Sequence, residues 1–188
     1  MTDVLVKKYT YAEFRSLEFP DNDLSNYELL DGEIVQKSSP SLQHQRISGN
    51  IYFQIRLYLT QNPIGEVFSA PLDVVLEDRT APQPDVFFVS KERDFILDER
   101  EGVVIGTPDL IVEIISPSSV QRDRYQKKEL YERFAVREFW LVDPQNRSIE
   151  IFKLAQNQFQ LHAFADETGA SIASTVLPGL EISVPKLM

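Results

Sequence analysis

Cysteine is absent from the 188-residue sequence. Its absence excludes disulfides and thiolate-ligated zinc or iron–sulfur sites, and it removes the main reason to expect an oxidising compartment. The sequence also lacks any run of about 18 uninterrupted apolar residues, so no transmembrane helix is expected. The N-terminal segment has neither a long apolar stretch nor a small-residue cleavage site, which argues against a secretory signal. We therefore expect a cytoplasmic protein that does not associate with a membrane.

Glycine is scarce, with 7 residues, and the 11 prolines are scattered along the chain. Internal repeats, low-complexity tracts and Gly/Ser linkers are lacking, so residues 1–188 are predicted to form a single domain. The hydrophobic content of 43% and the charged content of 26% are typical of a globular protein. The net charge of −10 argues against a protein that coats nucleic acid with a basic surface. The negative net charge remains compatible with a protein that binds a single phosphate group through a bound cation.

Local patterns predict a mixture of strands and helices. Thr10 and Glu13 form a capping box ahead of a short helix from about Tyr11, and Asp31-Gly32 is a type I′ hairpin signal between strands at 27–30 and 33–37. An apolar stripe of Ile47, Ile51, Ile55 and Tyr58 at helical spacing predicts a long helix over 41–61, and a later helix is predicted over 120–134. Further strands are expected at 66–69, 72–76, 86–89, 110–115, 138–142, 148–154, 159–164 and 181–184. This order predicts an α/β or α+β fold with a central mixed sheet.

Glu113 is the most informative single residue, because it lies among five apolar residues in the segment LIVEII at 110–115. A charged carboxylate in a strand covered on both faces costs several kcal/mol unless a cation, a proton or a buried base compensates it. The segment therefore indicates either a functional carboxylate or a structural one at a sheet edge or in a buried pair.

Two Pro-Asp pairs offer a second carboxylate near Glu113. Asp109 lies on the same strand, about 13 Å away at about 3.3 Å per residue, which is too far to share one small cation. Asp85 opens a separate strand, and the two carboxylates can meet across about 5 Å if that strand pairs with the Glu113 strand. Geometry favours Asp85, although a plain Pro-Asp turn is the simpler alternative.

A base is expected from the later helix, where Asp123, Lys127, Tyr131 and Phe134 recur at helical spacing. Tyr131 and Phe134 must face the sheet if the helix packs, so Lys127 lies on or beside the buried stripe, whereas Lys128 is rotated by about 100°. The alternative is an exposed ion pair between Asp123 and Lys127, which contributes little stability.

Two residues upstream complete the candidate set. Glu28 lies in the first strand of the hairpin and is a third available carboxylate. His44 lies in the first turns of the long helix, where a lone histidine is more often a structural hydrogen-bonding residue than a ligand.

These residues together resemble the Uma2 family of bacterial endonucleases, which belongs to the PD-(D/E)xK restriction-endonuclease-like group. The resemblance covers nearly the whole chain and rests on the order and spacing of several short motifs. They are YELLDGE at 27–33, SPSLQH at 39–44, PDV at 84–86, VEIISPSS at 112–119, then Asp123, Lys127 and Tyr131, and EFWLVDP at 138–144. One departure from the wider group is that Ile115, not lysine, stands two residues after Glu113. Lys127 on the following helix is the matching position.

The resemblance implies a restriction-endonuclease-like core: a central mixed sheet flanked by helices, with an N-terminal hairpin and a long early helix. It implies that Asp85, Glu113 and Lys127 are catalytic, and that Asp85, Glu113 and Glu28 hold Mg²⁺, with Mn²⁺ as a substitute. His44 and Asp123 would support them. The expected activity is Mg²⁺-dependent hydrolysis of DNA phosphodiester bonds by a homodimer.

Two other functions remain open on the sequence alone. A nuclease fold without activity would serve as an interaction module, and it predicts no metal binding. A metal-dependent hydrolase of a small phosphoester predicts turnover of model phosphodiesters without affinity for DNA.

Overall fold

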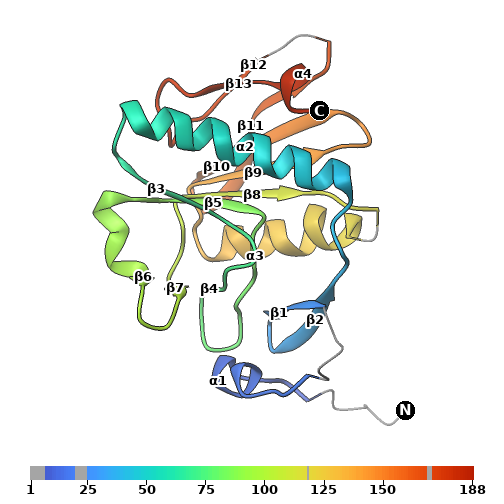
Figure 1. Cartoon of the computed structure of the whole chain (residues 1–188), viewed down its shortest axis with the longest axis vertical. Coiled ribbons are helices and arrows are strands. Elements are labelled where there is room, and N and C mark those ends of the chain that lie inside the picture. The colour runs from blue at the N-terminus through green and yellow to red at the C-terminus, as the bar shows by residue number, and fades with distance from the viewer. Residues whose placement is uncertain (1–6, 20–24, 118, 169–170) are drawn as a thin grey trace.

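A computed structural model describes residues 7–19, 25–117, 119–168 and 171–188 (Figure 1). Ser118 of the VEIISPSS motif lies outside these ranges. The centre of the molecule is a six-stranded sheet in the order β11-β10-β9-β8-β5-β3. β8 and β9 run parallel, whereas the other neighbours are antiparallel, so the predicted mixed sheet is confirmed. The bounds are β3 Gly65–Ser69, β5 Val86–Ser90, β8 Leu110–Ile114, β9 Glu138–Asp143, β10 Ser148–Ala155 and β11 Gln158–Asp166.

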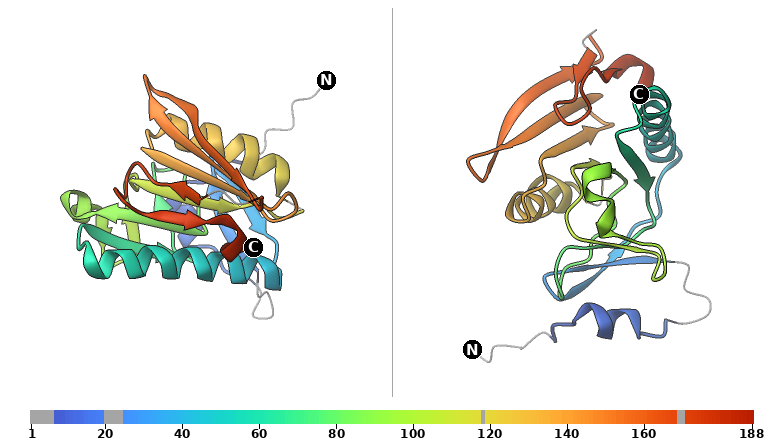
Figure 2. Two further views of the ribbon diagram at one scale, coloured as in Figure 1. Left: turned by 90° about the horizontal axis from the view of Figure 1, so that it is seen from above. Right: turned by 90° about the vertical axis from the view of Figure 1, so that its left-hand side faces the viewer.

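Helices cover both faces of this sheet (Figure 2). Helix α2 (Leu42–Gln61) packs on one face, and the π-helical segment η2 (Arg122–Lys127), continued by α3 (Lys128–Arg133), packs on the other. Side chains alternate between the two faces of a strand, so Val112 and Ile114 contact the α2 side while Ile111 contacts the α3 side. Glu113 therefore belongs to the α3 side.

The long helix forms as predicted, with a small difference in its buried stripe. Ser41 caps its N-terminus by accepting a hydrogen bond from the His44 backbone N–H. Its buried residues are Ile47, Ile51, Ile55 and Leu59, whereas the predicted Tyr58 is only partly buried. Among the described residues, no helix is long and apolar enough to cross a bilayer.

The N-terminal segments form a lobe below the sheet (Figure 1). It contains α1 (Tyr11–Arg15) with the predicted capping box, and the hairpin of β1 (Asn26–Leu30) and β2 (Glu33–Lys37). Asp31 and Gly32 have φ of 49° and 81°, as the type I′ turn requires. Leu29 and Ala81 exchange two backbone hydrogen bonds, of 3.1 and 2.7 Å, and these dock the hairpin onto the body.

The short elements were the least predictable. A small three-stranded sheet contains β4 (Val74–Val75), β6 (Leu97–Asp98) and β7 (Val103–Ile105), so the strand predicted over 72–76 is shortened to two residues. The 3₁₀ segment η1 (Lys91–Ile96), β12 (Ser171–Ala173) and helix α4 (Val184–Leu187) were not predicted, whereas β13 (Glu181–Ser183) was. Strands of two or three residues carry too little periodicity to be recognised, because distant partners define them.

Candidate active site

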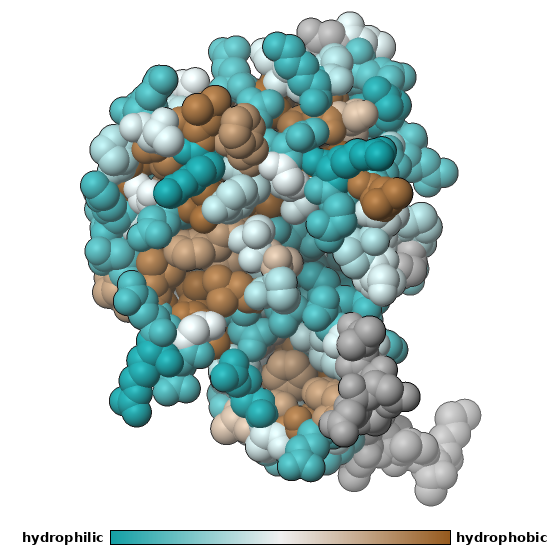
Figure 3. Space-filling model, viewed as in Figure 1, coloured by the Kyte–Doolittle hydropathy of each residue, from teal (hydrophilic) through white to brown (hydrophobic). Residues whose placement is uncertain are grey.

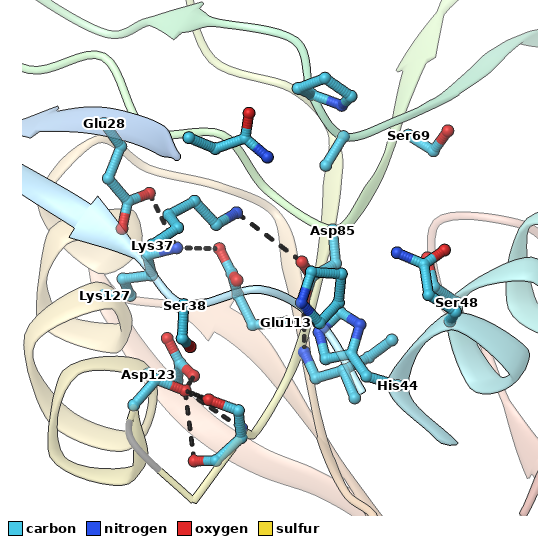
Figure 4. A pocket seen from close by; sticks show the side chains of 18 of the residues that line it. Glu28, Lys37, Ser38, His44, Ser48, Ser69, Asp85, Glu113, Asp123 and Lys127 are labelled. Atoms are coloured by element: carbon cyan, nitrogen blue, oxygen red, sulfur yellow. Dashed lines mark hydrogen bonds and ion pairs between the residues drawn. The ribbon is translucent and has the colours of Figure 1, made fainter. Parts of the chain in front are cut away.

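A polar pocket of about 260 Å³ lies where the sheet, the hairpin and both helical layers meet. The first half of α2, β1 and β2, the residue before β5, the end of β8 and the η2 segment all contribute to its lining. On the face shown in Figure 3, apolar patches gather below the C-terminal half of α2, while hydrophilic groups prevail toward its N-terminal half. Figure 4 shows charged side chains that line this pocket: Glu28, Lys37, His44, Asp85, Glu113, Asp123 and Lys127.

Strand pairing brings Asp85 and Glu113 together. β5 and β8 are antiparallel, with Val86 opposite Val112. Continuing this register by one residue places Asp85 opposite Glu113, on the same face of the sheet, where cross-strand neighbours have Cβ atoms about 5 Å apart. The pairing on which the choice of Asp85 over Asp109 depended is therefore present. Asp109 is fully buried elsewhere, where it accepts hydrogen bonds from Arg137 (3.0 Å) and the Ser90 backbone N–H (2.8 Å).

Glu113 is 2% exposed and lies among apolar side chains on the α3 side of the sheet. Its Oε1 atom accepts hydrogen bonds from Lys127 Nζ (3.0 Å) and from the Tyr131 hydroxyl (2.5 Å). Burial raises the pKa of Glu113 to about 8, even though the Lys127 charge opposes the shift. The buried Glu113 carboxyl group is therefore harder to ionise than an exposed glutamate in the metal-free protein.

Lys127 bridges two carboxylates. Its Nζ atom lies 3.0 Å from Glu113 Oε1 and 3.0 Å from Glu28 Oε2, and all three side chains are buried. Burial lowers the pKa of Lys127, but the surrounding carboxylates outweigh it and raise the pKa overall. Burial alone would raise the pKa of Glu28, yet the charges of Lys127 and Lys37 hold it below its usual value. Glu28 and Lys127 therefore form a buried ion pair, and Glu113 accepts a hydrogen bond from the same amine.

The prediction that Lys127 faces inward and Lys128 does not is confirmed. Lys127 is 2% exposed, whereas the Lys128 amine lies over the Phe152 ring, 3.9 Å from its centroid. Lys127 lies on a π-helical turn, which has i→i+5 hydrogen bonds and is wider than the α-helix predicted from the sequence. Asp123 is also buried, at 4% exposure, and Ser119 Oγ donates a hydrogen bond to it. An exposed ion pair between Asp123 and Lys127 is therefore excluded.

The Asp85 carboxylate contacts a histidine, a backbone N–H group and a lysine. Its Oδ2 atom lies 3.1 Å from His44 Nε2 and accepts a 2.8 Å hydrogen bond from the Ile114 backbone N–H. Its Oδ1 atom lies 3.8 Å from Lys37 Nζ. Burial raises the pKa of Asp85, but the His44 hydrogen bond and the Lys37 charge bring it below its usual value. Burial lowers the pKa of His44, and the contact with Asp85 more than reverses this. His44 thus contacts a candidate carboxylate directly.

The predicted site residues do not all occupy equivalent places. Asp85 precedes β5 and Glu113 lies on the neighbouring strand β8, whereas Glu28 lies against the amine of Lys127, on the side away from Asp85 (Figure 4). Arg122 lies 3.7 Å from Glu28 Oε1, an oxygen that accepts no hydrogen bond from the described residues. The same residues contain no ready-made group of three or more histidine, aspartate or glutamate side chains arranged around a metal.

Sequence reasoning missed Lys37 and the hydrogen bond of Tyr131. A signal for Lys37 exists in the hairpin, where Glu28 pairs with Val35 and Asn26 pairs with Lys37. Residues two apart on a strand share a face, so the Asp31-Gly32 turn already places Glu28 and Lys37 on the same side. Tyr131 follows Lys127 by one helical turn and was assigned only to the core.

In the metal-free protein, the free energy of unfolding should fall as the pH rises from about 4.5 to about 8. Folding raises the pKa of Glu113 from 4.5 to about 8, so the folded state binds this proton more tightly than the unfolded chain does, and the benefit is lost as the pH passes the folded pKa. The raised pKa of His44 acts in the same direction. Urea denaturation with a chelator, followed by the fluorescence of the buried Trp140, measures the trend. Stability that increases over this interval would contradict the prediction, and Glu113→Gln should flatten the slope.

A mixed sheet flanked by helices, with carboxylates and a lysine meeting in one pocket, places the protein in the restriction-endonuclease-like fold class. The model of the Uma2 family, described as "Putative restriction endonuclease", matches residues 11–185, and the chain belongs to this family.

The chain is also similar to two other proteins. A crystal structure titled as a "putative nuclease belonging to DUF820" from Anabaena variabilis ATCC 29413 superposes with a TM-score of 0.75. The two chains are 22% identical, and the match covers 95% of this chain and 96% of that one, which shows the shared fold. "Uncharacterized protein sll1609" from Synechocystis sp. (strain ATCC 27184 / PCC 6803 / Kazusa) is 26% identical over 145 residues, covering 76% of this chain and 79% of the relative.

Proposed function

We propose that the protein is a Mg²⁺-dependent endonuclease that hydrolyses DNA phosphodiester bonds. One observation carries the proposal. Asp85, which precedes β5, and Glu113 of the paired strand β8 line the same pocket, and the Lys127 amine lies 3.0 Å from Glu113 Oε1. Family membership supports a nucleic acid as the class of substrate.

The chemistry of the donor set fits Mg²⁺. This ion prefers oxygen ligands, keeps several of its waters, and is usually held by one or two carboxylates together with substrate phosphate rather than by an all-protein cage. Asp85 and Glu113 supply such a pair, and they need no third preformed ligand. Glu28, whose Oε2 is engaged by Lys127, would contribute as a ligand only through its other oxygen. When bound, the ion supplies an activated water and polarises the scissile phosphate.

The side chains of the pocket would bind the ion, position the attacking water and stabilise the charge that develops on the phosphate. Asp85 is ionised and fixed by His44 and the Ile114 backbone N–H, so it presents an oriented carboxylate without rearrangement. Lys127, kept charged by Glu28 and Glu113, would position the attacking water or stabilise charge developing on the phosphate. Tyr131 and Glu28 act as positioning residues, because they fix Glu113 and Lys127 respectively. Asp123 lines the same pocket and supports the charge of Lys127.

Two substrates distinguish the candidate functions. The wild-type protein is incubated at increasing Mg²⁺ concentrations with supercoiled plasmid and, separately, with a small phosphodiester. The proposal expects plasmid cleavage that rises with Mg²⁺ and stops with a chelator, with Mn²⁺ as a working substitute. Turnover of the small phosphodiester alone would indicate a different hydrolase. Absence of both activities and of Mg²⁺ binding would indicate a non-catalytic module.

The expected homodimer can be tested in the same reactions. A dimer with two coordinated sites should convert supercoiled plasmid directly to the linear form, and light scattering should give twice the 21.6 kDa chain mass. Accumulation of nicked circles by a monomeric protein would contradict this part of the proposal.

A further inference from the structure

Lys37 is a charged side chain beside a candidate metal ligand, and the sequence left it unassigned. It ends β2, its side chain is 19% exposed, and Figure 4 shows its amine directed into the pocket toward Asp85. Nζ donates a 2.7 Å hydrogen bond to the Gln83 carbonyl oxygen and lies 3.8 Å from Asp85 Oδ1. The backbone N–H of Gln83 in turn donates to Glu28 Oε2 at 3.3 Å. The amine is therefore placed by the hairpin and by the segment that leads into β5.

The two oxygens of Asp85 have different partners. His44 and the Ile114 backbone N–H engage Oδ2, whereas Lys37 is the cation paired with Oδ1 within the described part of the chain. A buried carboxylate without compensation costs several kcal/mol, so this amine helps the metal-free protein to tolerate an ionised Asp85. Its charge also acts on Glu28, His44 and Glu113.

A divalent ion that binds through Asp85 Oδ1 would approach the position of the Lys37 amine. Like charges a few ångströms apart in a partly buried site repel strongly. The lysine stem has four flexible carbons, so the amine can leave Asp85 without any movement of the backbone.

We infer that Lys37 is a tethered cation that competes with the divalent ion for Asp85. In the metal-free protein it neutralises the carboxylate, and the ion must displace it in order to bind. Lys37 therefore weakens metal affinity while it stabilises the metal-free fold. The inference rests on the proposed function, because it requires Asp85 to be a metal ligand.

Calorimetric titration of Mg²⁺ into chelator-dialysed protein tests the competition directly. The Lys37→Met protein should bind Mg²⁺ about tenfold more tightly than the wild type, which is a typical size for coupling between two bound groups. Lys37→Arg keeps the charge and should bind no more tightly than the wild type. In thermal denaturation, Lys37→Met should melt at a lower temperature without metal and gain more from added Mg²⁺.

Lys153→Met is the matched control, because it removes the same charge from an exposed position on β10. Its affinity for Mg²⁺ should equal that of the wild type. Circular dichroism checks folding, and Lys37→Gln replaces Lys37→Met if the latter does not fold.

A purely structural role for Lys37 would weaken metal binding in these variants, so an unchanged or weaker affinity overturns the inference. If the wild type binds Mg²⁺ and cleaves DNA in that case, the proposed function survives. If the wild type binds no Mg²⁺, both the inference about Lys37 and the proposed function are wrong.

Discussion

The Glu113→Gln protein should cleave plasmid roughly 10²- to 10³-fold more slowly than the wild type, while its metal-free fold stays intact. Glutamine has nearly the shape of glutamate, and burial already disfavours the charged form of Glu113 by raising its pKa to about 8. The Tyr131 hydroxyl and the Lys127 amine can still donate to the remaining carbonyl oxygen. What the substitution removes is the negative charge that Glu113 can offer to a bound cation.

Initial rates of plasmid cleavage at saturating Mg²⁺ measure this effect, and calorimetry reports whether the ion still binds. Glu99→Gln is a suitable control, because it makes the same chemical change at an exposed position outside the pocket. Urea denaturation should place the unfolding free energy of Glu113→Gln within about 1 kcal/mol of the wild type at neutral pH. Cleavage by Glu113→Gln at the wild-type rate would remove Glu113 from the site.

Much of the pocket could be predicted because a few residues conflict with their local surroundings. Glu113 is a carboxylate in an otherwise apolar strand, and Lys127 is an amine beside a stripe that must face the sheet. Both conflicts are resolved in the structure by the contact between the two side chains. Asp85 followed from strand geometry, since only a neighbouring strand could bring a second carboxylate within reach.

The remaining features depend on interactions that local sequence does not record. The π-helical turn that carries Asp123 and Lys127 has the same apolar spacing as an ordinary helix, so only packing against the sheet distinguishes the two. The approach of Lys37 to Asp85 requires the hairpin to dock through Leu29 and Ala81, which are far apart in the sequence. Similarly, Glu28 was recognised as an available carboxylate, but its position against the Lys127 amine depends on that docking.

Lys127→Met should destabilise the metal-free protein by about 3 to 5 kcal/mol, the usual cost of breaking a buried ion pair by removing one partner. The substitution leaves Glu28 buried and ionised without the amine that lies 3.0 Å away, and Glu113 loses one of its two hydrogen-bond donors. Urea denaturation in the presence of a chelator, followed by Trp140 fluorescence, measures the change. Lys128→Met is the control on the same helix. It removes an amine that lies over the Phe152 ring and should cost about 1 kcal/mol or less.

A double-mutant cycle identifies the cause of that loss. Glu28→Gln removes the charge that Lys127 neutralises, so the double variant Glu28→Gln/Lys127→Met should be more stable than the sum of the single effects by about 2 kcal/mol. Glu113 lies at the same 3.0 Å from the Lys127 amine and also raises the pKa of Lys127, so the cycle Glu113→Gln/Lys127→Met measures how much of the coupling belongs to this second carboxyl group. Equal coupling in both cycles would show that Lys127 compensates the two carboxylates alike. Additive behaviour in both would mean that Lys127 stabilises the fold by packing rather than by charge.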